Sequence, residues 1–241
     1  MKKITNLLLL ALLVFSYQAN AYPNNNRPKT VTQEERMIGS FRGIASGGSL
    51  TIKVTMGIKE SVRFEGDKDA IAELITEVDG GTLGIKPKTK WSEWSRRYNR
   101  PEITVYITAK KLNTLTLSGS GSITVTNAIT GPDLTTTLSG SGSITTNASV
   151  GTFTGVISGS GTVTVTGKAD NSTLTLSGSG NFRGKNLSTN KVSVQISGSA
   201  DVYIRASQKI DAVVSGSGNI YYSGEASVTK TIIGSGNISK I

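Results

Sequence analysis

The sequence predicts an all-β fold, a parallel β-helix (solenoid) of about seven coils preceded by a small mixed α+β cap. Two observations predict it. A short serine–glycine phrase recurs through the last half of the chain at spacings of 18 to 21 residues, and the positions that flank it are apolar in every copy. A fixed period near 20 residues is typical of solenoids, in which each unit stacks on the unit before it.

The repeated phrase is SGSG or a close variant of it. Its seven copies begin at positions 118, 139, 158, 177, 197, 215 and 233, the last with Ile233 in place of the first serine. Around each copy, Val, Ile, Thr or Leu alternates with polar residues, and Gly and Ser are dense. This pattern favours strands and turns over helical repeats.

Two apolar columns flank the phrase. The first consists of Leu117, Leu138, Ile157, Leu176, Ile196, Val214 and Ile232, and the second of Ile123, Ile144, Val163, Phe182, Val202, Ile220 and Ile238. Both columns fall on the same side of a pleated strand, so we expect them to form continuous ladders inside the solenoid. The serines should lie outside, while the glycines should point inward and let the wall bend.

A further turn is expected near the middle of each repeat, for example at Asn127-Ala128. Turns at this spacing also suit an antiparallel sandwich. Parallel coils are favoured because like residues stack on like in every column.

Four segments are expected along the chain. Residues 1–21 read as a secretory signal peptide, with Lys2 and Lys3 before an apolar run and small residues at Ala19 and Ala21. Residues 22–35 are expected to be a disordered leader, residues 36–112 a strand-rich cap with one short helix, and residues 113–241 the solenoid. No later apolar run is long enough to span a membrane.

Within the cap, residues 49–56, 60–65, 82–86 and 103–107 read as strands. Residues 67–78 read as the helix, because Ala70, Ile71 and Leu74 recur at helical spacing and Asp67 suits its first turn.

The composition limits the chemistry. The chain has no His and no Cys, so the most common general base, the soft metal ligands and the Cys nucleophile are missing. The few carboxylates of the repeats fall in different columns, unlike the carboxylate pairs of glycan-cleaving enzymes. We therefore expect no enzyme activity, no cofactor and no metal. The formal net charge of +10 favours anionic partners.

The segment KPKTKWSEWSRRYNR, residues 86–100, is the candidate ligand-binding site. Aromatic rings stack on sugars or lie at lipid interfaces, and Arg side chains bind carboxylates and phosphates. The alternative is a long β-hairpin tip whose aromatic residues pack on the cap. The candidate binding residues are Lys88, Lys90, Trp91, Trp94, Arg96, Arg97, Tyr98 and Arg100.

The order of a strand-rich opening, a helix over 67–78, a TLGIKP strand and serial SGSG repeats resembles the bacterial head-GIN family over roughly residues 36–241. Members are exported proteins described as adhesin heads and also as a domain of unknown function. The resemblance implies a β-helical protein at the cell envelope, and it supplies no catalytic residues.

The leading hypothesis is a non-enzymatic protein of the periplasm, outer-membrane surface or extracellular space that binds glycans, lipopolysaccharide or other anionic envelope polymers. Export makes nucleic acid a poor partner. The alternative is a purely structural protein, or one that self-assembles as a homo-oligomer through an open C-terminal coil. A polysaccharide-active β-helix enzyme is the distant alternative.

Overall fold

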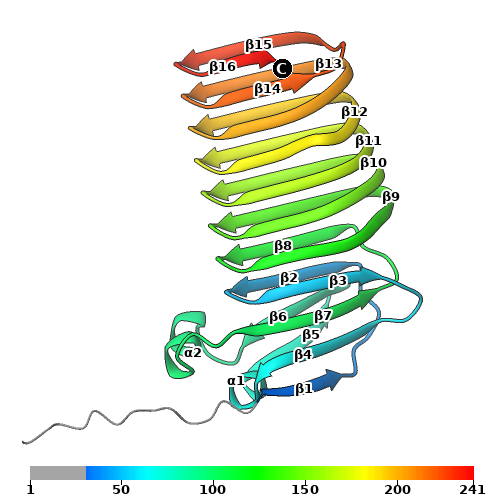
Figure 1. Ribbon diagram of the computed structural model, residues 1–241, viewed down its shortest axis with the longest axis vertical. Coiled ribbons are helices and arrows are strands. Elements are labelled where there is room, and N and C mark those ends of the chain that lie inside the picture. The colour runs from blue at the N-terminus through cyan, green and yellow to red at the C-terminus, as the bar shows by residue number, and fades with distance from the viewer. Residues whose placement is uncertain (1–30) are drawn as a thin grey trace, which may run out of the picture.

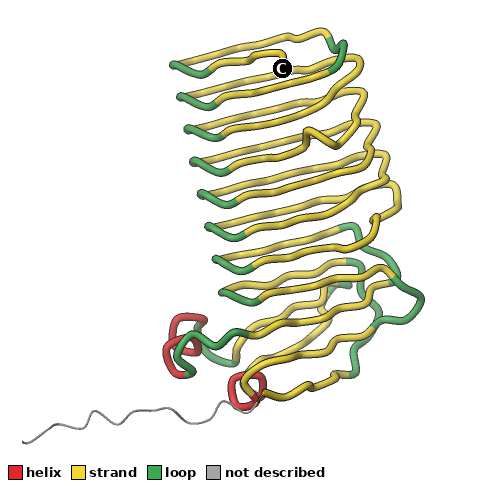
Figure 2. The backbone as a smooth tube through the Cα atoms, viewed as in Figure 1, coloured by secondary structure: helices red, strands yellow, loops and turns green. Residues whose placement is uncertain are grey.

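The computed structural model describes residues 31–241, which form a flattened rod of stacked coils with a smaller cap at one end (Figures 1 and 2). Its strands join in a single sheet whose solenoid coils pair in parallel. The prediction of a parallel β-helix is confirmed. The predicted signal peptide and residues 22–30 of the predicted leader lie outside the described residues.

The first half of the chain supplies the cap and the first coils. Its elements are β1 (Val31–Arg36), β2 (Gly43–Gly48), β3 (Thr51–Met56), β4 (Ser61–Asp67), α1 (Lys68–Ala72), β5 (Leu74–Asp79), β6 (Thr82–Pro87), α2 (Trp91–Arg97), β7 (Ile103–Ala109) and β8 (Thr114–Gly119). The second half contains β9 (Ser122–Gly140), β10 (Ser143–Gly159), β11 (Thr162–Gly178), β12 (Asn181–Gly198), β13 (Asp201–Gly216), β14 (Asn219–Ser223), β15 (Ser227–Gly234) and β16 (Asn237–Lys240).

The strands from β9 to β13 are unusually long because each one passes along one wall, around a curved edge and back along the other wall (Figure 1). The predicted mid-repeat turns of these coils are therefore bends within continuous strands, whereas the last one is a loop between β14 and β15. Register shifts mark some of the bends: Thr145 pairs with Thr124 and Asn147 with Ala128, so β9 carries the extra residues at its bend. The SGSG phrase forms the sharp corner at the opposite edge, where one coil ends and the next begins.

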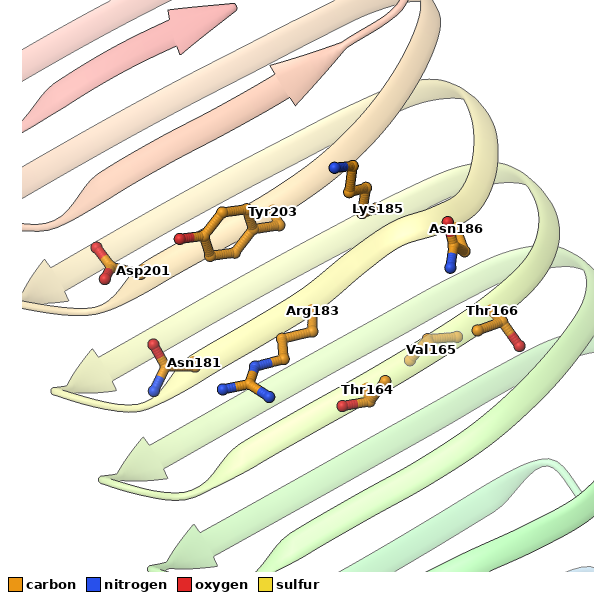
Figure 3. A pocket seen from close by; sticks show the side chains of 9 residues that line it. All are labelled: Thr164, Val165, Thr166, Asn181, Arg183, Lys185, Asn186, Asp201 and Tyr203. Carbon is orange, nitrogen blue, oxygen red and sulfur yellow. The ribbon is translucent and has the colours of Figure 1, made fainter. Parts of the chain in front are cut away.

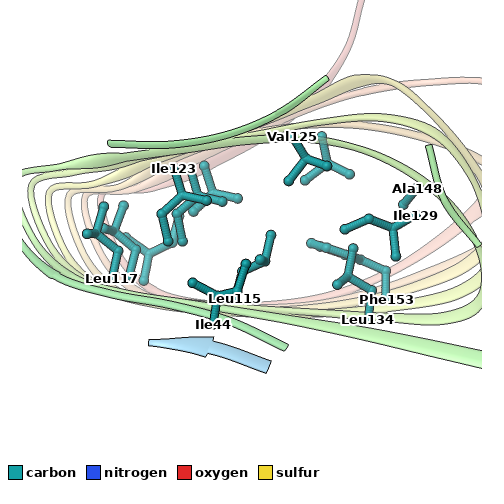
Figure 4. Packing of buried hydrophobic residues seen from close by; sticks show 14 of the residues in the cluster. Ile44, Leu115, Leu117, Ile123, Val125, Ile129, Leu134, Ala148 and Phe153 are labelled. Atoms are coloured by element: carbon teal, nitrogen blue, oxygen red, sulfur yellow. The ribbon is translucent and has the colours of Figure 1, made fainter. Parts of the chain in front are cut away.

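The two predicted apolar columns line the interior, as Figure 4 shows for Leu117 and Ile123. Their members in the first six copies of the phrase are at most 1% exposed. In the last copy, Ile232 and Ile238 are only partly buried. In the six copies that begin with serine, this first serine is exposed, as predicted. The repeat therefore encodes a continuous core with a hydroxyl-coated corner.

The glycines of the corner have two separate roles. The second glycine, such as Gly161, is buried. The first, such as Gly159, has a φ of 118°, a region that favours glycine. The carbonyl oxygen of Gly140, one coil earlier, accepts hydrogen bonds from Ser160 N at 3.0 Å and Gly161 N at 2.9 Å. Each corner is thus fastened to the preceding one by backbone hydrogen bonds.

The cap differs from the prediction in its first residues. Residues 31–35 were expected to belong to a disordered leader, but they form most of β1, which pairs antiparallel with β4. Arg36 stabilises this edge strand, because its guanidinium donates to the carbonyl oxygen of Ile71 at 2.8 Å and lies 4.4 Å from the ring centroid of Phe64. The leader prediction is therefore wrong for residues 31–35.

The predicted helix over 67–78 is also too long. Asp67 does cap a helix, accepting from Ala70 N at 3.0 Å, but α1 ends at Ala72. The remainder forms β5, which pairs antiparallel with β6 across the Gly80–Gly81 turn. The β-branched residues of this segment favour a strand, and the apolar spacing did not distinguish the two states.

Parallel stacking begins well before residue 113. β2 pairs in parallel with β8, and β3 with β9, so residues 43–56 already form a coil. Gly48 lies in register with Gly119, which makes the segment IASGGSLTI a degenerate copy of the phrase. The cap and the solenoid therefore share one continuous sheet.

Candidate functional site

The candidate segment 86–100 is not a β-hairpin tip. Its centre is α2, so the cap contains two short helices rather than one. The helix ends in a Schellman motif, in which Arg100 N donates to Ser95 O at 2.6 Å and Asn99 N to Arg96 O at 3.2 Å. Asn99 and Arg100 have φ values of 52° and 51°. Asn is tolerated in that conformation, and Pro101 prevents the helix from continuing.

The two tryptophans attach α2 to the body of the protein. Trp94 is 1% exposed, and its indole nitrogen donates to the carbonyl oxygen of Ala70 at 3.0 Å. Trp91 is half-buried and lies over β2, where a Cβ on Gly47 would come within 2.6 Å of its indole nitrogen. The two rings meet edge to face with centroids 5.6 Å apart. Trp94 therefore belongs to the core and does not present its ring to a ligand.

The basic residues of the segment have different surroundings. Lys88 forms an ion pair with Glu73 at 3.4 Å. Four others are exposed and form no ion pair within residues 31–241. They are Lys90, Arg96, Arg97 and Arg100, which we call the α2 cationic cluster. Arg97 lies 6.0 Å from the ring centroid of half-buried Tyr98, and the binding role of all these residues stays a prediction.

The cluster gives α2 a single chemical character. Glu93 is the only acid between residues 86 and 100. Figure 1 shows α2 projecting from the cap at one side of the molecule. The four cations of the cluster are exposed there. Guanidinium groups in such a position can bind carboxylates or phosphates in a planar, two-bond arrangement.

Neither a metal site nor a membrane-spanning helix is found among residues 31–241. No group of acidic side chains is arranged to hold a metal ion. No helix in this part of the chain is long and apolar enough to cross a membrane.

The fold and this cap arrangement can be compared with known proteins. Residues 40–226 match the family described as "Putative auto-transporter adhesin, head GIN domain". The chain belongs to the head GIN domain family. The resemblance inferred from the sequence is thereby confirmed. A comparison of this head GIN protein with curated proteins gives no match.

Solved structures share the head GIN fold. A putative adhesin from Bacteroides fragilis NCTC 9343 is similar with a TM-score of 0.77 and 23% identity, covering 88% of this chain and 98% of that one. A putative lipid binding protein from Parabacteroides distasonis ATCC 8503 has a TM-score of 0.72 and 25% identity, with 88% and 96% covered. A putative adhesin from the same Parabacteroides strain has a TM-score of 0.70 and 20% identity, with 88% and 97% covered.

Sequence reasoning missed a second candidate region on the solenoid wall of this head GIN protein. The column Thr124, Thr145, Thr164 is interrupted by Arg183, Tyr203 and Tyr221. That change of residue type is the sequence signal for a local site.

Proposed function

We propose that this protein is a non-enzymatic recognition module, exported to the bacterial envelope or cell surface, that binds anionic polymers through the α2 cationic cluster. The observation that carries this proposal is the gathering, on one short projecting segment, of four exposed cations that form no ion pair within residues 31–241. The family description and the adhesin names of similar structures support a binding role. The α2 cluster would bind uronic acids or the phosphates of lipopolysaccharide.

The arrangement of the acids supports a role without catalysis. Catalytic carboxylates of a glycan-cleaving β-helix would sit on neighbouring coils a few ångströms apart. Here Asp201 is in register with Asn181 and Asn219, and Asp211 with Ser193 and Thr229. No two acids of the described solenoid occupy paired positions on adjacent coils.

Binding of purified protein to lipopolysaccharide and to isolated envelopes tests the proposal. The decisive variant is Arg96→Ala/Arg97→Ala, which removes two cations from the cluster without touching the core. The matched control is Lys191→Ala/Lys230→Ala, which removes two exposed charges elsewhere. We expect saturable binding that weakens at least about tenfold in the first variant and also weakens with added salt. Equal binding by both variants would contradict the proposal.

The tryptophans are poor probes of binding. Trp94→Ala would remove a buried side chain and destabilise the cap by about 3–5 kcal/mol, so a loss of binding would not show ligand contact.

Binding to vesicles of neutral and of anionic lipids is a further experiment, because one similar structure is named a putative lipid binding protein. Binding to neutral vesicles would contradict recognition by charge.

Self-assembly is a second candidate, favoured by the surface of the last described coil. Ile233 is 65% exposed and Ile241 is 54% exposed, and among residues 31–241 strand β15 pairs only with β13. Such an edge can pair with another chain. Sedimentation over a range of concentrations would show this association, and Ile233→Lys would abolish it.

A further inference from the structure

A groove of about 510 Å³ opens on the outer wall of the solenoid beside β12 (Figure 3). We call it the β12 groove. Its presence follows from a bulge, because Gly184 is in register with Ile204 while Ser188 is in register with Arg205. Residues 185–187 therefore have no counterpart on β13, and the wall is no longer flat there. Lys185 stands on this bulge and lines the groove.

The residue types change at this groove. In earlier coils the register position is occupied by Thr124, Thr145 and Thr164. In the following coils the same position holds Arg183, Tyr203 and Tyr221. The two tyrosine rings stack with centroids 4.8 Å apart and planes 18° from parallel. Tyr221 thus supports Tyr203, which lines the groove.

A second ladder, of amide and carboxylate groups, runs beside the first. It consists of Asn181, Asp201 and Asn219 in register. The Asn219 amide donates to Asp201 Oδ1 at 3.0 Å, which holds the carboxylate in place at the groove. Asp201 keeps a second oxygen that can accept from a ligand hydroxyl.

The positive charges of the groove are free to bind a ligand. Arg183 and Lys185 are both exposed, and neither forms an ion pair within residues 31–241. Figure 3 shows Arg183 between Asn181 and Thr164, which is on the previous coil. Asp201 and Tyr203 lie on the next coil. The groove thus combines a cationic fork, a rigid aromatic wall, and amide and carboxylate groups.

We propose that the β12 groove binds an acidic saccharide, a uronic-acid unit of a glycan. Arg183 would bind the sugar carboxylate with two parallel hydrogen bonds, and Lys185 would add a second positive charge. Asn181 and Asp201 would bind the ring hydroxyls, and the apolar face of the sugar would lie against Tyr203. The volume is within the usual range for small-ligand sites.

Calorimetric titration with a galacturonate hexasaccharide tests the proposal. The fully methyl-esterified hexasaccharide is the matched ligand control, since it keeps the sugars and lacks the charges. We expect saturable binding of the acidic form and at least about tenfold weaker binding of the ester. Arg183→Ala should weaken binding of the acidic form at least about tenfold, while Lys191→Ala, which removes an exposed charge from the same strand, should leave it unchanged.

Three further variants separate the parts of the site. Tyr203→Phe should retain most of the affinity and Tyr203→Ala should lose it, with circular dichroism confirming that both remain folded. Arg96→Ala/Arg97→Ala removes the α2 cationic cluster and should leave this binding in place. The groove proposal is overturned if the hexasaccharide does not bind, if the ester binds equally, or if binding survives Arg183→Ala. If the lipopolysaccharide binding proposed for the α2 cationic cluster is not found, the proposal for the β12 groove is unaffected.

Discussion

Gly159 shows why an alanine cannot replace the first glycine of the phrase. Its φ is 118°, and a Cβ there would lie 2.6 Å from Gly140 O, the oxygen that accepts two corner hydrogen bonds. We expect Gly159→Ala to lower the free energy of unfolding by about 2–4 kcal/mol, through backbone strain and weakened hydrogen bonds. Urea denaturation followed by circular dichroism measures this. Gly131→Ala is the control, since its added Cβ would meet no atom of residues 31–241 within 4 Å other than its chain neighbours. Equal losses would contradict the explanation.

Ser46 is a polar residue in an apolar ladder. It is 5% exposed, it lies in register with Leu117 and Ile85, and its hydroxyl makes no hydrogen bond within residues 31–241. We expect Ser46→Ala to raise the free energy of unfolding by about 1 kcal/mol, because a buried hydroxyl without a partner is unfavourable. The exposed Ser49 in the same corner provides the control, Ser49→Ala, which should change stability by less than about 0.5 kcal/mol. A destabilised Ser46→Ala would indicate that the hydroxyl has a partner.

At the scale of elements, Glu60 and Lys110 join the start of β4 to the end of β7. Lys110 Nζ lies 3.0 Å from Glu60 Oε2, and this hydrogen bond lowers the pKa of Glu60 below its usual 4.5. The unfolded chain therefore binds this proton more readily than the folded protein. The resulting stabilisation is present above the unfolded pKa and is lost as the pH falls through the folded pKa.

Glu60→Gln should consequently shift the urea midpoint downward at about pH 7 and have little effect at about pH 3. Urea titrations of both proteins at the two pH values make the measurement. Glu225→Gln is the control, because Glu225 is exposed where it pairs with Lys240. A shift of the same size at both pH values would show that the pair does not act through the charge of Glu60.

The elements also show what the sequence could and could not predict. The parallel coils were predictable because seven copies repeat the same two apolar positions. The agreement among the copies identifies the strands even where one copy alone would fit more than one secondary structure. The cap holds only one degenerate copy of the phrase, so its segments had to be assigned singly, by local spacing. Residues 74–79 have an apolar spacing that fits both a helix and a strand, and pairing with β6 decides between them.

The candidate site was predictable only in part. Composition identified the basic, aromatic segment 86–100, but not that Trp94 is buried against the carbonyl of Ala70. The β12 groove depends on a bulge and on register between coils, which bring together Arg183 and Tyr203, 20 residues apart. Alignment of the columns shows the change in residue type, but the three-dimensional register is needed to show that a groove results.

On the scale of the whole molecule, stability should vary along the rod. In a solenoid each coil contacts mainly its neighbours, so its stability depends on how many sides are covered. β10 is paired with β9 and β11 and surrounds a fully buried core. Among residues 31–241, β15 pairs only with β13, and its own Ile232 is only partly buried.

Hydrogen exchange followed by mass spectrometry can measure this gradient. We expect the amides of β15 and β16 to exchange fastest and those of β10 and β11 slowest, because opening the last coil exposes little apolar surface. Gly159→Ala should raise exchange in the coils formed by β9, β10 and β11 more than in β2 and β3, because the disturbed corner contacts only its neighbours. Uniform protection from β8 to β16 would instead show that the rod unfolds as one cooperative unit and that its coils do not open separately.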